Sequence, residues 1–283
     1  MTTIPPLSEI VIEDIVRRAL KEDFGDAGDI TTKSTIPADA QSKAVIAARQ
    51  AGVIAGVQAG LAAFRLVDPT IEIKVAKGDG ASVKKGDTVF ELNGPSRGIL
   101  SAERTALNFL GHLSGIATAT AQFVNAIKNT GAKIAGTRKT TPGLRAVEKH
   151  AIRCGGGSSH RYGLYDAVMI KDNHIVAAGG FEKALAAAKS YVGHMVKVEV
   201  EIDRLDQLDA ALKGGAHVIM LDNMSAEDMK KAVKRVGGRA ILEASGNVTL
   251  ETIRAIAETG VDVISSGWLT HSAPNLDLGM DFQ

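Results

Sequence analysis

The sequence predicts an α/β protein in which a parallel β/α barrel follows a smaller α/β region. From residue 133 onward, six apolar runs rich in β-branched residues alternate with helical stretches, a pattern typical of strand–helix units in a parallel sheet. Each run ends in polar residues, and a barrel gathers the carboxyl ends of its strands at one mouth. An open, doubly wound sheet would scatter the same residues, so we prefer the barrel.

The composition fits a large globular protein without a chain-wide preference for polyanions. The chain has 283 residues, and 45% of them are hydrophobic, which is enough for a sizeable core. Its formal net charge of +1 argues against nucleic acid or an anionic membrane as a partner. We therefore expect any anion-binding site to be local.

The N-terminal stretch and the cysteine count both favour the cytoplasm. MTTIPPLSEIVIEDIVRRAL is acidic and amphipathic and contains no uninterrupted apolar core, so it reads as neither a signal peptide nor a membrane span. The single cysteine, Cys154, excludes an internal disulfide and a cysteine-based zinc cluster. We interpret Cys154 as a packed bystander at a helix end.

The first half of the chain mixes helices with short strands. Residues 7–21 predict a helix with Ser8 as its N-cap and Glu9 in its first turn. Three β-branched runs separated by glycine-containing turns predict strands at 43–49, 71–76 and 87–92. The alanine-rich segment 101–128 predicts one or two helices that lead into the second half.

Each of the six later runs is followed by polar residues at its carboxyl end. The runs are AKIAG, DAVMI, HMVKVEV, HVIML, RAILEA and VDVIS. The residues at their ends are Thr137-Arg138-Lys139, Lys171-Asp172, Glu201, Asp222, Ser245-Gly246 and Ser266-Gly267.

These side chains predict a polyanionic ligand at the mouth. Arg138, Lys139, Arg161 and Lys171 would converge there with His160, and such a cluster suits carboxylates and phosphates. The Ser-Gly turns after the last two strands occupy the usual position of a phosphate cradle in barrels.

Two acidic residues complete the predicted mouth. Glu201 and Asp222 suit the binding of sugar hydroxyls or a magnesium ion, although ion pairs with Lys139 or Lys171 would also account for them. The sequence contains no HExxH motif and no recognisable nucleophile–base pair. We therefore expect positioning and charge complementarity to supply the catalysis.

Eight motifs make the chain similar to quinolinate phosphoribosyltransferases along nearly its whole length. They are GDITT (28–32), SAERTALNFL (101–110), TRKTTPGLR (137–145), CGGGSSHRYGLYDAVMIKDNH (154–174), VEVE (198–201), LDN (221–223), EASGN (243–247) and SSGWLTHSAPNLD (265–277).

The resemblance implies a fold, an assembly and a reaction. It implies an N-terminal α/β sandwich domain, residues 1–115 joined by the tail 270–283, and an incomplete six-stranded barrel over 116–269. It also implies a homodimer with shared active sites, open to a higher oligomer. In this family quinolinate reacts with phosphoribosyl pyrophosphate and Mg²⁺ to give nicotinate mononucleotide, pyrophosphate and CO₂, a step that feeds NAD synthesis.

The resemblance also implies residue roles. Arg138, His160 and Arg161 resemble the binders of the quinolinate carboxylates, together with Arg104 from the neighbouring subunit. Lys139 and Lys171 resemble the lysines that hold substrate and pyrophosphate, and with Glu201 and Asp222 they form the expected catalytic set. The remaining expected binding residues are Thr140, Ser245, Gly246, Asn247, Ser266, Gly267 and Trp268.

Two places in these motifs need a separate comment: the choice between Glu199 and Glu201, and a departure from the family pattern at Ser159. Glu199 and Glu201 point to the same side of their strand by alternation, and we assign the ribose and metal role to Glu201 because it lies nearer the strand's end. Ser159 departs from the family pattern, in which a longer amide side chain is expected before the His-Arg pair.

Three other functions are compatible with parts of the sequence. A barrel relative of the molybdenum-transport-associated type would take a different base, although Arg104, Arg138 and Arg161 together favour a dicarboxylate. A Schiff-base aldolase would use Lys171 as its nucleophile. A non-catalytic anion-binding protein would need only the cationic cluster.

Overall fold

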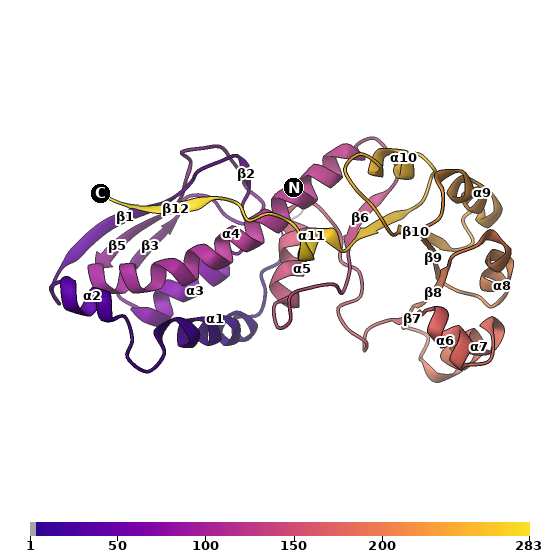
Figure 1. Cartoon of the computed structure of the whole chain (residues 1–283), viewed down its shortest axis with the longest axis horizontal. Coiled ribbons are helices and arrows are strands. Elements are labelled where there is room, and N and C mark those ends of the chain that lie inside the picture. Colours follow the sequence, from indigo (N-terminus) through magenta and orange to yellow (C-terminus); the bar gives the residue numbers. More distant parts are fainter. Residues whose placement is uncertain (1–3) are drawn as a thin grey trace. The chain divides into compact units, whose positions relative to one another are not determined.

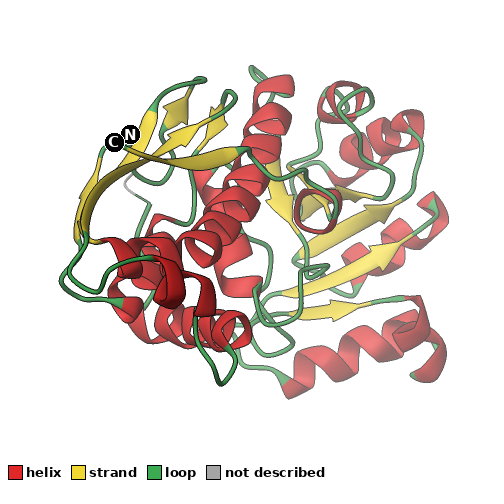
Figure 2. Cartoon of the chain, turned by 60° about the vertical axis from the view of Figure 1, so that its left-hand side comes forward, coloured by secondary structure: helices red, strands yellow, loops and turns green. Residues whose placement is uncertain are grey.

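The computed structural model describes residues 4–283, which form two compact units (Figures 1 and 2). Unit 1 comprises the chain up to Ala121 together with Thr140–Gly156 and Leu269–Gln283, and unit 2 comprises Gln122–Lys139 and Gly157–Trp268. The first three residues of the N-terminal stretch lie outside the described part. The units differ from the expected division mainly at residues 140–156, which group with unit 1. The division into independently folding domains stays a prediction.

Unit 1 is built on a four-stranded antiparallel sheet with the strand order β12-β1-β5-β3. β1, β3 and β5 overlap the three runs predicted as strands, at 43–49, 71–76 and 87–92, which confirms these strands. A separate two-stranded ladder pairs β2 with β4. The bounds are β1 (Gln41–Ala48), β2 (Gly52–Val53), β3 (Glu72–Val75), β4 (Ser82–Val83), β5 (Thr88–Pro95) and β12 (Leu278–Phe282).

Helices pack on this sheet around one apolar core. Phe64, Phe90 and Leu110 are fully buried in that core, and a Cβ on Gly60 would lie 3.0 Å from the Phe90 ring, so helix α3 runs close to the sheet. The predicted first helix is confirmed and packs against α3, although the Ser8 side chain makes no capping hydrogen bond. The bounds are α1 (Glu9–Phe24), α2 (Ile30–Thr35), α3 (Val57–Val67), α4 (Ser96–Ala126) and α5 (Arg145–Cys154).

The C-terminal tail packs closely against α4, which is a single helix of 31 residues. The Leu276 backbone N–H donates a hydrogen bond to the Gly111 carbonyl at 2.9 Å. A Cβ on Gly115 would lie 2.1 Å from the Pro274 carbonyl oxygen, so only glycine allows this approach. The tail then continues into β12, which pairs with β1.

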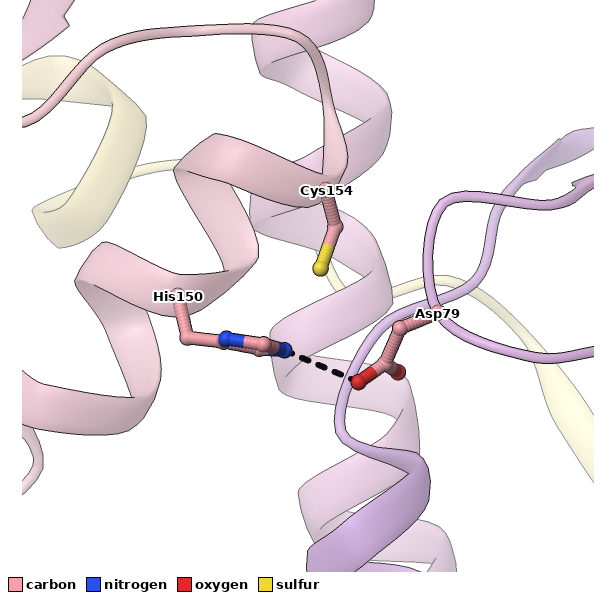
Figure 3. Close-up of side chains that lie close together, drawn as sticks. All are labelled: Asp79, His150 and Cys154. Atoms are coloured by element: carbon pink, nitrogen blue, oxygen red, sulfur yellow. Dashed lines mark hydrogen bonds and ion pairs between the residues drawn. The ribbon is translucent and has the colours of Figure 1, made fainter. Parts of the chain in front are cut away.

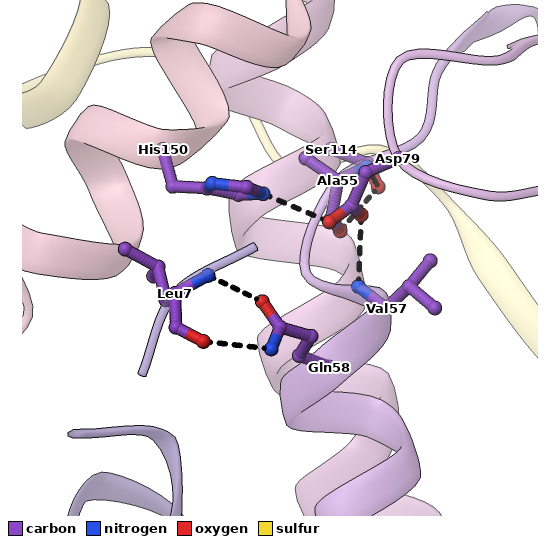
Figure 4. Close-up of polar contacts among 7 residues, drawn as sticks. All are labelled: Leu7, Ala55, Val57, Gln58, Asp79, Ser114 and His150. Carbon is purple, nitrogen blue, oxygen red and sulfur yellow. Dashed lines mark hydrogen bonds and ion pairs between the residues drawn. The ribbon is translucent and has the colours of Figure 1, made fainter. Parts of the chain in front are cut away.

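Asp79 joins a loop of unit 1 to two of its helices (Figure 4). One of its carboxylate oxygens accepts a hydrogen bond from the Val57 backbone N–H at 3.0 Å, and the other lies 2.9 Å from Nε2 of His150. Cys154 lies on the same helix as His150 and is buried beside the pair (Figure 3). Burial, and then the charge of Asp79, raise the pKa of the Cys154 thiol well above its usual range. The thiol is therefore neutral and packed, as predicted.

Unit 2 carries the six predicted strands as one parallel sheet with the order β6-β11-β10-β9-β8-β7. Within the described chain, β6 and β7 form the two edges of this sheet and do not pair with each other, so the barrel is incomplete, as expected. The bounds are β6 (Lys133–Gly136), β7 (Val168–Ile170), β8 (Val198–Ile202), β9 (Val218–Asp222), β10 (Ile241–Ser245) and β11 (Val263–Ser266).

The connections between these strands are helical. β8 begins at Val198, later than the predicted run at 194–200, because residues 193–196 form a turn. The bounds are α6 (Asp172–Ala177), α7 (Phe181–Tyr191), the 3₁₀ helix η1 (Leu205–Gln207), α8 (Leu208–Lys213), α9 (Ala226–Val236), α10 (Ile253–Ala257) and α11 (Trp268–His271).

Over residues 4–283, the helices are all too short or too polar to serve as a membrane span.

Candidate active site

The carboxyl ends of the six parallel strands place most of the predicted site residues on unit 2. The strand register aligns Ser245 with Asp222 and Ser266 with Gly136, so these ends lie along one edge of the sheet. We call this edge the strand-end mouth and define it by Lys139, Lys171, Glu201, Asp222, Ser245 and Gly267. Arg138, His160, Arg161, Gly246, Asn247, Ser266 and Trp268 belong to the same unit.

One face of the sheet carries a concentration of carboxylates. Glu201 aligns with Met220, and Met220 aligns with Glu243, so these side chains share a face. Alternation along each strand adds Glu199 and Asp222 to that face. Glu199 and Glu243 are only 5% and 3% exposed, so they lie in the interior of the unit.

Lys171 and Glu201 form an ion pair at the mouth. Lys171 directly follows β7, and its ammonium group contacts a carboxylate oxygen of Glu201 on the adjacent strand. The Lys171 side chain remains 46% exposed, so a ligand at the mouth can reach its charge. The contact therefore supports the alternative in which Glu201 forms a structural ion pair with Lys171. The same two side chains can still bind a ligand at the mouth.

The ends of β9 and β10 are joined by a network of amides. The Asn223 Nδ2 donates to Asp222 at 2.8 Å, and the Asn247 Nδ2 donates to Oδ1 of Asn223 at 3.1 Å. Asn223 and Asn247 both have positive φ, and a Cβ on Gly246 would lie 2.1 Å from that Oδ1. The turn after β10 thus requires Gly246, and its geometry orients Asp222.

Lys139 lies against the turn that follows β11. The Lys139 backbone N–H donates to Oγ1 of Thr137 at 3.0 Å, which folds the segment after β6 over the strand end. A Cβ on Gly267 would lie 2.7 Å from Cδ of Lys139 and 3.3 Å from Oγ1 of Thr137. The first and last strands of the unit therefore bring a lysine and a Ser-Gly turn together, as the sequence predicts.

Residues 158–167 run from one edge of the incomplete barrel to the other. Ser158 bridges to Ala135 of β6, and β7 begins at Val168 beside β8. His160, on this segment, lies with Nε2 3.1 Å from Glu199 and 3.5 Å from Glu243. Its Nδ1 accepts a hydrogen bond from the Arg161 backbone N–H at 2.8 Å.

Arg138 and Arg161 are close enough to influence each other. Burial, and then the positive charge of Arg138, lower the pKa of the Arg161 guanidinium, while the charges of Glu199 and Asp166 act in the opposite direction. The Arg161 Nη1 also donates to the Ala167 carbonyl at 3.2 Å. Two partly buried guanidinium groups beside one another suit a ligand with two carboxylates.

The other predicted residues divide between the two units. Arg104 is exposed on α4 and Thr140 accepts a hydrogen bond from Arg145, and both belong to unit 1. Trp268 stacks on Phe123 with ring centroids 5.8 Å apart, and this packing gives the indole ring a structural role. Ser159 is exposed and contacts the Tyr162 hydroxyl.

Sequence reasoning did not assign roles to Glu199, Glu243 and Asn223. A signal was present for the two glutamates, because each is a charged residue inside an otherwise apolar strand run and a buried charge needs a partner. Asn223 gave a weaker signal, because its left-handed backbone is not visible in the sequence.

The chain matches known proteins over nearly its full length. Residues 116–281 match the family model for the quinolinate phosphoribosyl transferase C-terminal domain, and residues 29–114 match the model for the N-terminal domain. A probable nicotinate-nucleotide pyrophosphorylase [carboxylating] of Bacillus subtilis is 42% identical over 97% of this chain and 94% of its own. The corresponding Mycobacterium leprae protein is 44% identical over 95% and 96%.

Solved structures agree with the sequence matches. The nicotinate-nucleotide pyrophosphorylase from Francisella tularensis has a TM-score of 0.95 and 40% identity, and the match covers 100% of both chains. The one from Ehrlichia chaffeensis has a TM-score of 0.92 and 39% identity, over 95% of this chain and 98% of its own. The two neighbouring arginines, the strand-end lysines and the six-stranded incomplete barrel thus occur in a chain that belongs to the quinolinate phosphoribosyltransferase family.

Proposed function

We propose that the strand-end mouth joins quinolinate to the ribose of phosphoribosyl pyrophosphate. The pyridine nitrogen forms a bond to C1′ of the ribose while the bond from C1′ to pyrophosphate breaks. The carboxylate next to the nitrogen then leaves as CO₂, its bonding electrons stay on the ring carbon, and that carbon takes up a proton from water to give nicotinate mononucleotide. The reaction makes the protein a decarboxylating pentosyltransferase of NAD biosynthesis.

The observation that carries the proposal is the presence of two sets of cationic side chains on one unit, suited to two different anionic groups. Arg138 and Arg161 offer two neighbouring guanidinium groups for a dicarboxylate, while Lys139 lies beside the Gly267 turn, where a phosphate or pyrophosphate would lie. Ribosyl transfer passes through an oxocarbenium-like state, so placing charges of the right sign around C1′ supplies much of the catalysis. Departing pyrophosphate would be stabilised by Lys139 and Lys171.

The acidic residues at the mouth fit a magnesium ion held jointly with the substrate. Glu201 and Asp222 offer carboxylate oxygens near the ends of adjacent strands, and Mg²⁺ is usually bound by one or two carboxylates plus substrate phosphates. When bound, the ion neutralises charge on the pyrophosphate group. The two carboxylates would also accept hydrogen bonds from the ribose hydroxyls.

We further propose that the active enzyme is a homodimer in which Arg104 completes the neighbour's site. Arg104 is exposed on α4 of unit 1, whereas the other two predicted carboxylate-binding arginines belong to unit 2. An exposed cation outside the strand-end set is the kind of group that a twofold partner can contribute. We also infer a cytoplasmic location, supported by a single, buried cysteine that suits a reducing compartment.

Substrate-dependent pyrophosphate release tests the proposed activity. We expect release from phosphoribosyl pyrophosphate and Mg²⁺ only when quinolinate is added, and little when nicotinate, which lacks one carboxylate, replaces it. Release that is independent of the pyridine would contradict the assignment. Borohydride trapping of a substrate on Lys171 would instead identify the aldolase alternative.

A further inference from the structure

His160, Glu199 and Glu243 form a buried cluster below the strand-end mouth. The ring of His160 is 11% exposed, and the two carboxylates approach its Nε2 from β8 and β10. Glu199 makes the shorter contact, at 3.1 Å, whereas the 3.5 Å separation from Glu243 exceeds an ordinary N–H···O hydrogen bond. Glu199 is therefore the main partner of this ring nitrogen.

Glu199 lies deeper in the sheet than the residues at the mouth. It precedes Glu201 by two residues on the same strand face, which corresponds to roughly 6–7 Å along β8. Because Nε2 of His160 reaches this deeper position, the ring nitrogen points into the unit. The expected contact of His160 with a substrate carboxylate stays a prediction, and in this structure Nε2 is directed at Glu199.

The ring of His160 connects the backbone at Arg161 to β8. Its Nδ1 accepts a hydrogen bond from the Arg161 backbone N–H, so Nδ1 carries no proton and a neutral ring carries its proton on Nε2, which faces Glu199 at 3.1 Å. The chain at 160–161 is thus anchored through one imidazole to a buried carboxylate.

Arg161 needs such an anchor. Its guanidinium lies close to Arg138, and their mutual repulsion opposes the arrangement, while the charge of Glu199 favours it. Displacement of a substrate-positioning group by about 1 Å can cost roughly a hundredfold in rate. A fixed backbone at Arg161 is therefore valuable to a site that recognises a dicarboxylate.

We propose that Glu199 is a positioning residue that, through the ring of His160, holds Arg161 in place to bind the pyridine dicarboxylate. The inference rests on the proposed function for the identity of the ligand. It adds Glu199 as a residue that acts without touching the substrate. It also gives His160 a role in fixing the position of Arg161.

A matched pair of variants separates positioning from charge. Glu199→Gln and Glu199→Met both remove the negative charge and keep the length of the side chain, but only glutamine retains an oxygen that can accept a hydrogen bond from Nε2 of His160. We expect the Kd for quinolinate, measured by isothermal titration calorimetry, to be at least about tenfold higher in Glu199→Met than in Glu199→Gln. The KM for phosphoribosyl pyrophosphate should differ less than about twofold between the two, because the proposed function assigns that substrate to Lys139, Lys171 and the Gly267 turn.

Controls distinguish this role from a loss of stability or from metal binding. Ile219→Val removes one methyl from a fully buried side chain of the same unit, on the strand face opposite Glu201, and should leave both substrates unaffected. Equal quinolinate affinities in Glu199→Gln and Glu199→Met would overturn the proposal. So would a stoichiometric divalent metal in the wild type that Glu199→Met lacks, because Glu199 would then be a ligand.

The ring tautomer gives a readout that needs no substrate. In ¹⁵N-histidine NMR spectra assigned with His160→Gln, we expect Nε2 of His160 to carry the proton and Nδ1 to carry none. A proton on Nδ1 in the wild type would overturn the positioning role whether or not the enzyme is active. Conversely, absence of quinolinate-dependent turnover with the expected tautomer would refute the proposed function alone.

Discussion

Gly267 lies so close to Lys139 that a Cβ on the glycine would be 2.7 Å from Cδ of the lysine. The atom it would meet belongs to a flexible side chain, and Gly267 has no positive φ, so Gly267→Ala should fold normally while displacing Lys139. We expect kcat/KM for phosphoribosyl pyrophosphate to fall at least about tenfold. Gly193→Ala is the control, because a Cβ there meets no atom within 4 Å, and equal activity of the two variants would contradict the assignment of Lys139.

Lys171→Ala tests the proposed stabilisation of the leaving pyrophosphate. Removing one preorganised electrostatic donor typically lowers the rate about 10²- to 10³-fold, and we expect a loss of at least about two orders of magnitude in kcat/KM. Steady-state kinetics on Lys171→Ala and on Lys197→Ala, which alters an exposed lysine of the same unit, provide the comparison. Near-normal turnover of Lys171→Ala would leave the Lys171–Glu201 pair with a structural role only.

Asp222→Asn tests the role of this carboxylate in binding Mg²⁺ and ribose. The substitution keeps the shape of the side chain and an oxygen that can accept the 2.8 Å hydrogen bond from Asn223, so the fold should survive. Loss of outer-shell partners alone often lowers metal affinity about 10- to 100-fold, and we expect the Mg²⁺ concentration for half-maximal activity to rise at least about tenfold. Asp209→Asn, at an exposed aspartate of the same unit, is the control. A change in melting temperature without a change in Mg²⁺ dependence would show that Asp222 is only structural.

Asp79→Ala is expected to destabilise the protein. The variant loses the acceptor for the Val57 N–H at the start of α3 and leaves Nε2 of buried His150 without its partner. A lost cap costs about 1 kcal/mol and an unsatisfied buried group about 1–3 kcal/mol, so the free energy of unfolding should fall by about 2–4 kcal/mol. Urea denaturation of this variant and of Asp39→Ala, at an exposed aspartate of the same unit, measures the difference. A loss no larger than that of the control would show that the contact contributes little.

Subunit complementation tests the contribution of Arg104 to its neighbour. Homodimers of Arg104→Ala and of Glu201→Ala should each be nearly inactive, because every site then lacks one group. After the two are refolded together in equal amounts, about half of the dimers are mixed and each has one intact site, so activity should return to about a quarter of the wild type. If mass-labelled subunits prove exchange but no activity returns, Arg104 serves its own subunit.

Much of the fold could be predicted because it rests on local patterns. All six parallel strands were visible as β-branched runs, and the polar residues at their ends indicated where the mouth lies. The roles of Glu199 and Glu201 could not be distinguished from the sequence, because alternation places both side chains on one face of the strand. How deeply each side chain is buried below the mouth depends on how the sheet curves. The grouping of Thr140 with unit 1 was also hidden, because it depends on long-range packing of residues 140–156.

The stoichiometry of a single reaction tests the central claim most directly. Quinolinate labelled with ¹³C in the carboxylate next to the nitrogen, mixed with phosphoribosyl pyrophosphate, Mg²⁺ and the enzyme, should yield labelled CO₂, pyrophosphate and nicotinate mononucleotide in equal amounts. Mass spectrometry of the nucleotide and the gas, with an enzymatic assay for pyrophosphate, measures all three products. Pyrophosphate without labelled CO₂ and without the nucleotide would mean that the mouth only hydrolyses the sugar phosphate, and it would contradict the proposed function.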